Sequence, residues 1–317
     1  MAEWLYEAGI GEARAALVEQ GTITVAQIER DEDRPRVGAV LSARLTDITV
    51  KGREGVVTLA VGGEALLAPL PAGISEGATL LVEIVRMALP ERGRAKRPRA
   101  VPAHSAAERD GPDLLERISA SGFSVRRLPA HEPDELEAVG WSEVIEEAAA
   151  GEIPFAGGAL RLSLTPAMTL IDVDGAPPLD RLAVAAAEAA ARAIRRLGIG
   201  GSIGIDFPTL EGRGPRQAVA QAIDATLPQP FERTAMNGFG FLQIVRRRRR
   251  PSLPEMCRDD PQGMAVRALL RRLERTPPPG ERLVHLSPAQ LALIRSRPDW
   301  IAELGRRTGV DTVFEER

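Results

Sequence analysis

Two short hydrophobic segments of this chain each end in an aspartate, and one predicted helix separates them. The first, TLIDVDG, carries Asp172 and Asp174, and the second, GGSIGIDF, carries Asp206. Between them, LDRLAVAAAEAAARAIRRLG predicts an Ala-rich helix over 179–197, which is long enough for a crossover between parallel strands. Because neighbouring parallel strands present their carboxyl ends at one edge of a sheet, we expect these aspartates to converge there.

Converging carboxylates favour a Mg²⁺ site, because Mg²⁺ prefers hard oxygen ligands and keeps several waters. A metal held in this way can polarise a phosphodiester and activate a water. The alternative is structural: aspartate is common where a strand turns into a loop, because its side chain bonds nearby backbone. The spacing alone leaves both interpretations open.

Arginine supplies almost all of the positive charge, since only Lys51 and Lys96 of the 41 basic residues are lysines. The planar guanidinium suits bidentate recognition of phosphate. Codon bias is an alternative source of arginine, because Ala, Gly and Pro are also abundant, but it does not explain why the basic residues cluster. One cluster contains Lys96, Arg97 and Arg99. We expect it to contact phosphate.

A second basic cluster is the uninterrupted run from Arg246 to Arg250. On a strand, Arg246, Arg248 and Arg250 would share one face and the two intervening arginines the other. The first set is our candidate for contacts with the phosphates of a bound ligand. A solvated charge run is the alternative.

The composition is that of an ordinary globular protein, with 44% hydrophobic and 27% charged residues and a net charge of −3. The length of 317 residues allows two or three domains. We find no apolar run of membrane-spanning length and no secretory signal at the N-terminus. A single cysteine, Cys257, excludes an internal disulfide, and the three histidines are isolated. These features predict a cytoplasmic location.

Changes in pattern divide the chain into five predicted parts. Residues around Gln20 and Gly21 predict a hairpin, short strands split by glycines predict a small barrel, and a polar, proline-rich stretch predicts a linker. The expected parts are N-terminal strands of the core at 1–35, an OB-type barrel at 36–90, a basic linker at 91–112, an α/β core at 113–257 and a small C-terminal α/β domain at 258–317.

Three passages resemble the bacterial ribonuclease E/G family. They are GGALRLSLTPAMTLIDVDG, EAAARAIRRLGIGGSIGIDF and GFGFLQIVRRRRRPSL, all within 157–253. The resemblance implies that residues 113–257 form an RNase-H-like and deoxyribonuclease-I-like catalytic core. The same resemblance implies that the barrel at 36–90, which splits this core, binds RNA. It also implies that Asp172 and Asp206 hold the metal, while Asp174 takes part in catalysis by joining them or by holding a metal-bound water.

The chain departs from the family pattern near the candidate site. Asp174 stands where the family has an asparagine, and Pro166 stands where it usually has a glutamate. The barrel lacks the Phe and His residues on which such domains usually stack bases. Phe239 and Phe241 alternate with glycine and are expected to lie in the core, since buried aromatics are the commoner case.

Two further departures concern binding sites outside the catalytic strands. The paired cysteines of the family's zinc link are reduced to Cys257, so we expect no structural zinc. The Arg-Thr-Ala segment that senses a 5′ monophosphate has no counterpart between 113 and 157.

The combined pattern predicts a Mg²⁺-dependent endoribonuclease that cleaves single-stranded RNA and acts as a monomer or dimer. The alternative is a catalytically weak or inactive RNA-binding protein of the same fold, which turnover of a labelled RNA would distinguish. A third class, an assembly partner that uses the acidic helices of 132–149, has only their charge in its favour.

Overall fold

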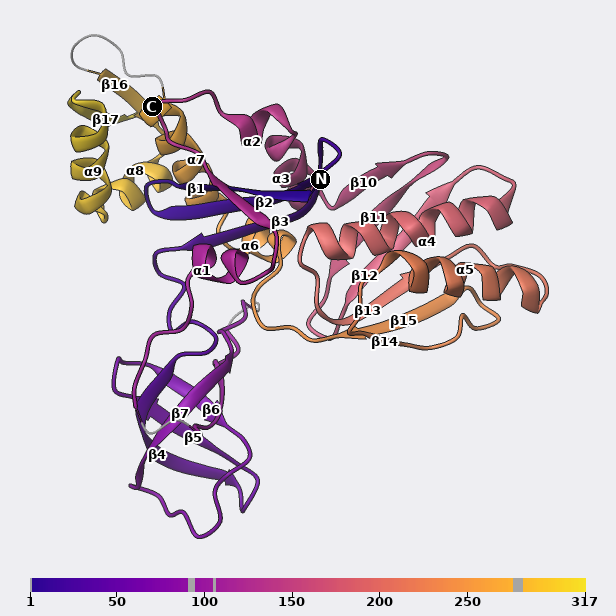
Figure 1. Cartoon of the computed structure of the whole chain (residues 1–317), viewed down its shortest axis with the longest axis horizontal. Helices are drawn as coiled ribbons and strands as arrows, with labels where there is room; N and C mark the ends of the chain where they lie inside the picture. The colour runs from indigo at the N-terminus through magenta and orange to yellow at the C-terminus, as the bar shows by residue number, and fades with distance from the viewer. Residues whose placement is uncertain (1, 91–94, 105–106, 276–281) are drawn as a thin grey trace. The chain divides into compact units, whose positions relative to one another are not determined.

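The computed structural model describes residues 2–90, 95–104, 107–275 and 282–317, and the chain is a mixed α/β protein (Figure 1). The predicted linker at 91–112 therefore falls partly outside the described residues. Contacts divide the chain into two compact units. Unit 1 comprises Met1–Asp31, Ile118–Ala150 and Leu253–Arg317, and unit 2 comprises Glu32–Arg117 and Gly151–Ser252.

Unit 1 contains a four-stranded sheet in the order β3-β2-β1-β9. Its strands are β1 (Ala2–Ala8), β2 (Glu12–Glu19), β3 (Thr22–Arg30) and β9 (Ser124–Arg127). The predicted turn at Gln20 and Gly21 is confirmed, and both residues have the positive φ that a tight hairpin requires. The helices of this unit before the C-terminal tail are α2 (Glu135–Ala138), α3 (Trp141–Ala150), α6 (Leu253–Asp259) and α7 (Pro261–Arg275).

The C-terminal tail of unit 1 has the order strand, helix, helix and strand. These elements are β16 (Arg282–Leu286), α8 (Pro288–Arg295), α9 (Pro298–Thr308) and β17 (Thr312–Glu316). The two strands pair in parallel, and the helices share an apolar cluster that includes Leu291, Trp300 and Leu304.

Unit 2 begins with a closed barrel in the order β4-β5-β6-β8-β7. Its strands are β4 (Val40–Val50), β5 (Glu54–Leu59), β6 (Glu64–Leu67), β7 (Thr79–Arg86) and β8 (Arg99–Pro102). The interior is apolar, with Leu45, Val57, Leu67 and Ile84 fully buried. The barrel is compatible with the predicted OB type, and its fifth strand lies within the stretch predicted as a linker.

Unit 2 also contains a six-stranded sheet in the order β10-β11-β12-β13-β15-β14. Its strands are β10 (Glu152–Phe155), β11 (Gly158–Leu164), β12 (Thr169–Gly175), β13 (Gly201–Asp206), β14 (Glu232–Arg233) and β15 (Phe241–Arg246). β12 and β13 are parallel, and α4 (Leu179–Arg196) connects them, which confirms the predicted crossover.

Helices pack on one face of this sheet, and the other face carries the candidate metal ligands. Helices α4 and α5 (Arg213–Thr226) pack together and lie over one face (Figure 1). The buried alanines of α4 allow close approach to the strands, so Ile171, Ile203 and Ile205 are fully buried. Side chains alternate along a strand, so the residues that directly follow these isoleucines, including both candidate metal ligands, lie on the opposite, open face.

Among the described residues, no helix is both long and apolar enough to cross a membrane. The remaining short helix, α1 (Leu114–Ser119), lies where the chain passes from unit 2 to unit 1.

Candidate nuclease site on the open face of the sheet

Asp172 and Asp206 are direct register partners on the parallel strands β12 and β13. Both side chains are exposed. Adjacent strands lie about 4.8 Å apart, so two carboxylates on one face at this separation can reach the same small cation. Asp206 is the last residue of its strand, whereas Asp172 lies inside β12. The pair therefore lies on the open face close to the carboxyl ends, rather than beyond them.

Asp174 lies on the same face of β12, but its carboxylate is held by an arginine. Nε of Arg161, on the neighbouring strand β11, lies 2.9 Å from Oδ2 of Asp174. In the part of the chain that the structure covers, no group of three or more acidic, Cys or His side chains is placed to hold a metal. The donor set is thus a pair of carboxylates, which fits Mg²⁺ because that ion is usually bound through one or two carboxylates plus waters and substrate phosphates.

An aromatic ring borders the acid pair on its other side. Phe241 of β15 is the register partner of Asp206. A Cβ atom at Gly204 would lie 2.4 Å from Cζ of Phe241, so only glycine leaves room for the ring at this position. Phe241 is half-buried, so its ring packs against the sheet and also forms part of the open face.

Phe239 lies outside the core, which shows that the prediction of a buried side chain was wrong. Its side chain is 86% exposed. The turn that presents it is well defined: Oδ1 of Asn237 accepts hydrogen bonds from the backbone N–H groups of Phe239 (2.9 Å) and Phe241 (3.0 Å). Gly240 has φ of 95°, and a Cβ atom there would lie 2.1 Å from the Phe207 carbonyl oxygen.

The arginine run continues β15 for only one residue, since the strand ends at Arg246. Arg246 is half-buried, and its Nη1 donates to the carbonyl oxygens of Ile194 and Ile199, each at 3.5 Å. Burial, followed by the charge of Arg195, lowers the pKa of Arg246. Part of this guanidinium is thus used to bind the carboxyl end of α4.

The structure brings two of the predicted RNA-binding arginines together and adds a third. Partial burial, followed by the positive charges of Arg99 and Arg248, lowers the pKa of Arg86 at the end of β7. A backbone hydrogen bond of 2.9 Å from Met87 to Arg249 places these segments side by side. Sequence reasoning missed Arg86 because it belongs to a barrel strand with no other basic residue.

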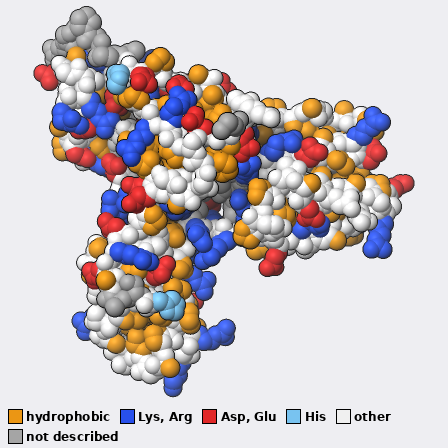
Figure 2. All heavy atoms as spheres, in the orientation of Figure 1, with side chains coloured by type: hydrophobic (Ala, Val, Ile, Leu, Met, Phe, Trp, Pro, Cys, Tyr) orange, Lys and Arg blue, Asp and Glu red, His pale blue; other side chains and the backbone are white. Residues whose placement is uncertain are grey.

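The other predicted RNA-binding residues lie in more varied surroundings. Arg97 forms an ion pair with Glu64 of the barrel, with Nη2 2.7 Å from Oε2. Lys96 is exposed, and its backbone pairs with that of Leu89. Arg250 is half-buried. On the face seen in Figure 2, basic and acidic side chains are interspersed, so the visible basic side chains do not form one continuous patch there.

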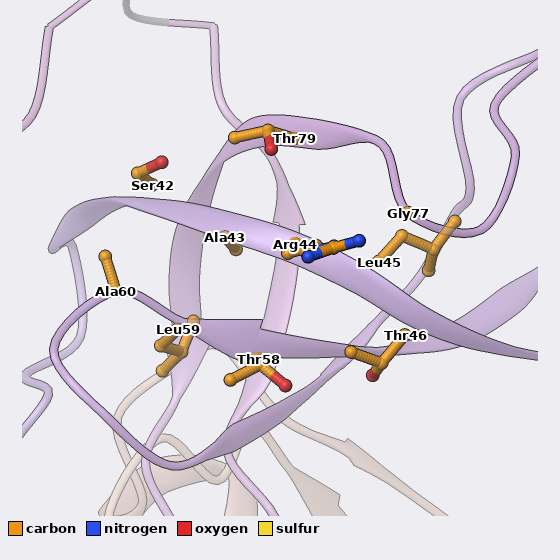
Figure 3. Close-up of a pocket in the computed structure, with 10 residues that line it drawn as sticks. All are labelled: Ser42, Ala43, Arg44, Leu45, Thr46, Thr58, Leu59, Ala60, Gly77 and Thr79. Atoms are coloured by element: carbon orange, nitrogen blue, oxygen red, sulfur yellow. The ribbon is translucent and has the colours of Figure 1, made fainter.

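The outer surface of the barrel has a shallow concavity of about 610 Å³ (Figure 3). Hydroxyl groups and one arginine supply its polar lining: Ser42, Arg44, Thr46, Thr58 and Thr79. Its lining residues include no aromatic side chain on which a base could stack.

Two adjacent arginines, Arg126 and Arg127, lie on β9 within 113–157, where a 5′-phosphate sensor was sought in the sequence. Arg126 of β9 forms ion pairs with Glu3 (3.3 Å) and with Glu135, whose Oε2 lies 2.6 Å from Nη2. The hydrogen bond to Glu135 is the first cause of the raised pKa of Arg126. The guanidinium is therefore already engaged by carboxylates.

Cys257 lies on α6 and is buried. Burial raises the pKa of its thiol to about 11. Since the thiolate is the form that ligates metals, this cysteine is poorly suited to bind zinc, and the absence of a structural zinc stays a prediction.

Comparison with known proteins gives a distant similarity to ribonuclease G, and no protein-family model matches the chain. In an alignment of 118 residues that covers 33% of its length, the chain is 30% identical to ribonuclease G of Escherichia coli strain K12 and to ribonuclease G of Shigella flexneri. The match spans 24% of the length of each of these proteins. The chain is thus distantly similar to ribonuclease G over about a third of its residues.

Proposed function

We propose that this chain is a metal-dependent endoribonuclease that cleaves single-stranded RNA. The observation that carries the proposal is the register pairing of Asp172 and Asp206 on an open sheet face. The similarity to ribonuclease G supports the choice of RNA as substrate. Within this proposal, unit 2 supplies the catalytic sheet, of RNase-H-like or deoxyribonuclease-I-like type, and an OB-type barrel that binds RNA.

The chain's own residues suit hydrolysis of a phosphodiester. Asp172 and Asp206 would hold Mg²⁺, which, when bound, lowers the pKa of a water and neutralises charge on a phosphoryl oxygen. The open face leaves room for an extended strand to lie across β12 and β13. The flanking phosphates would contact the positive charges of Arg86, Arg99 and Arg248. Such contacts fix the register of the RNA without reading its sequence. The products would carry a 5′ phosphate and a 3′ hydroxyl, as the family resemblance implies.

A cleavage assay tests this function. A labelled single-stranded RNA is incubated with the protein in Mg²⁺ or in EDTA, and both its length and its mobility with bound protein are followed. Shortening that requires Mg²⁺ supports the nuclease. A shift in mobility without shortening supports the alternative, an RNA-binding protein with little or no catalysis.

We expect RNAs with a 5′ monophosphate and a 5′ hydroxyl to be cleaved at similar rates. A sensor needs free donors arranged around a terminal dianion, whereas Arg126 is already paired with Glu3 and Glu135. The measurement compares two otherwise identical oligonucleotides at matched salt, because RNA affinity falls steeply as salt rises. A preference for the monophosphate of tenfold or more, about 1.4 kcal/mol, would show that the chain has a sensor elsewhere.

We expect Phe239→Ala to weaken binding of single-stranded RNA. An exposed aromatic ring on a fixed turn beside a nuclease site is suited to stacking on a base, and stacking contributes about 1–3 kcal/mol per base. Fluorescence anisotropy with a labelled RNA gives the affinity. Phe123→Ala is the matched control, since Phe123 is also exposed but lies in unit 1. Equal affinities of the two variants would exclude the stacking role.

A further inference from the structure

Arg161 occupies a position beside the acid pair that the sequence did not single out. It is the register partner of Asp172 on β11, so Arg161, Asp172 and Asp206 form one row across three adjacent strands. Register partners share a face of the sheet. The row therefore places a cation one strand away from the two carboxylates, on the same open face.

The guanidinium of Arg161 is turned toward β12, the strand that carries Asp172 and Asp174. Its other register neighbour is Glu152 of β10, yet the ion pair of 2.9 Å is made with Asp174, two residues beyond Asp172. The side chains of Arg161 and Asp174 are 63% and 47% exposed. Exposed ion pairs of this kind contribute little to stability, so stability of the sheet does not account for this arrangement.

The ion pair has a consequence for charge at the site. Asp172, Asp174 and Asp206 place three carboxylates on one face, and Arg161 neutralises one of them. A guanidinium has five N–H donors in a planar fork that matches phosphate geometry. Asp174 contacts Nε of Arg161. Other N–H groups of the guanidinium can therefore donate hydrogen bonds to an approaching phosphate.

We propose that Arg161 binds a non-bridging oxygen of the scissile phosphodiester, and that its ion pair with Asp174 holds the guanidinium in position before RNA arrives. The proposal rests on the nuclease function proposed above. A positive group at this point offsets the repulsion between the phosphate and the two carboxylates. It also stabilises the charge that develops on the phosphoryl oxygens during in-line attack.

A double-mutant experiment separates phosphate contact from simple neutralisation of Asp174. We expect Arg161→Gln to lower kcat for Mg²⁺-dependent cleavage about 100-fold, while the control Arg192→Gln, which removes an exposed arginine of α4, has no effect. The double variant Arg161→Gln/Asp174→Asn should stay far below Asp174→Asn alone. If the double variant instead cleaves as fast as Asp174→Asn, Arg161 only neutralises that aspartate and the proposal is overturned.

A binding measurement tests the same contact without catalysis. In an Asp172→Asn background, anisotropy with a labelled single-stranded RNA should show affinity lowered about tenfold by Arg161→Gln, as for the loss of a charged hydrogen bond, and unchanged by Arg192→Gln. Equal affinities would overturn the proposal. Thermal unfolding of each variant confirms that the sheet is intact. Because this measurement does not depend on turnover, lack of cleavage by the wild-type protein would contradict the nuclease function alone.

Discussion

Replacing either Asp172 or Asp206 by asparagine is expected to abolish Mg²⁺-dependent cleavage of RNA while leaving the fold intact. The two carboxylates lie in register on adjacent strands, and the described residues offer no larger acidic cluster to replace them. A metal contributes several kcal/mol to the stabilisation of transition-state charge, so its loss should lower kcat by roughly 10³-fold or more. Initial rates on a labelled single-stranded RNA across a range of Mg²⁺ concentrations give the measurement.

A matched control is available on the other side of the same sheet. Asp180→Asn makes the same chemical change at an exposed position in the first turn of α4, and it should cleave at the wild-type rate. Asp174→Asn should show a smaller loss than the two metal-site variants, because Asp174 is already held by Arg161. Circular dichroism confirms folding. Wild-type cleavage by either Asp172→Asn or Asp206→Asn would remove this pair from the catalytic site.

The crossover that brings the two aspartates together could be predicted because its signals are local. Each strand is a short apolar segment, and the alanine-rich helix between them has the length of a parallel crossover. The exact register, which pairs Asp172 with Asp206, could not be predicted, because three residues of β12 but five residues of β13 precede the aspartate. The hairpin at Gln20 and Gly21 was predicted from equally local signals.

Phe239 shows where local alternation misleads. Its spacing from Phe241 suggests two residues on one face of a strand, but β15 begins only at Phe241. The residue that separates them, Gly240, adopts a positive φ beneath the Phe207 carbonyl group, so the chain turns there. Asn237 followed by Gly-Phe-Gly carries the turn signal, and it outweighs the aromatic pattern.

Arg161 and Arg86 show a second limit of sequence reasoning. The ion pair of Arg161 with Asp174 depends on how β11 pairs with β12, and the approach of Arg86 to Arg248 depends on tertiary contacts between segments far apart in the chain. Neither residue lies in a basic cluster of the sequence. The arginine run could be found from sequence, but the half-burial of Arg246 against the end of α4 could not.

The second large effect is on stability, where Arg14→Met is expected to destabilise unit 1 by about 3–5 kcal/mol. Arg14 is 1% exposed, and its Nη2 lies 2.6 Å from Oε2 of the equally buried Glu7 and 2.5 Å from Asp134. Its guanidinium also lies 5.3 Å from the ring centre of Trp141. Methionine fills much of the volume of arginine, but the buried carboxylate of Glu7 loses the compensating positive charge of Arg14. Urea unfolding, followed by tryptophan fluorescence, gives the free energy of unfolding.

Two further measurements show whether the charge of Arg14 is responsible. Glu7→Gln/Arg14→Met should recover part of the lost stability, because it removes the uncompensated carboxylate.

Burial alone would raise the pKa of Asp134, but the Arg14 guanidinium outweighs it and the pKa is lowered from 3.8. The wild-type protein therefore has a stabilisation that is present above pH 3.8 and lost as the pH falls through the folded-state pKa. Arg14→Met should reduce this acid dependence. If Arg14→Met is as stable as the exposed-site variant Arg192→Gln, the ion pairs of Arg14 contribute nothing to the stability of unit 1.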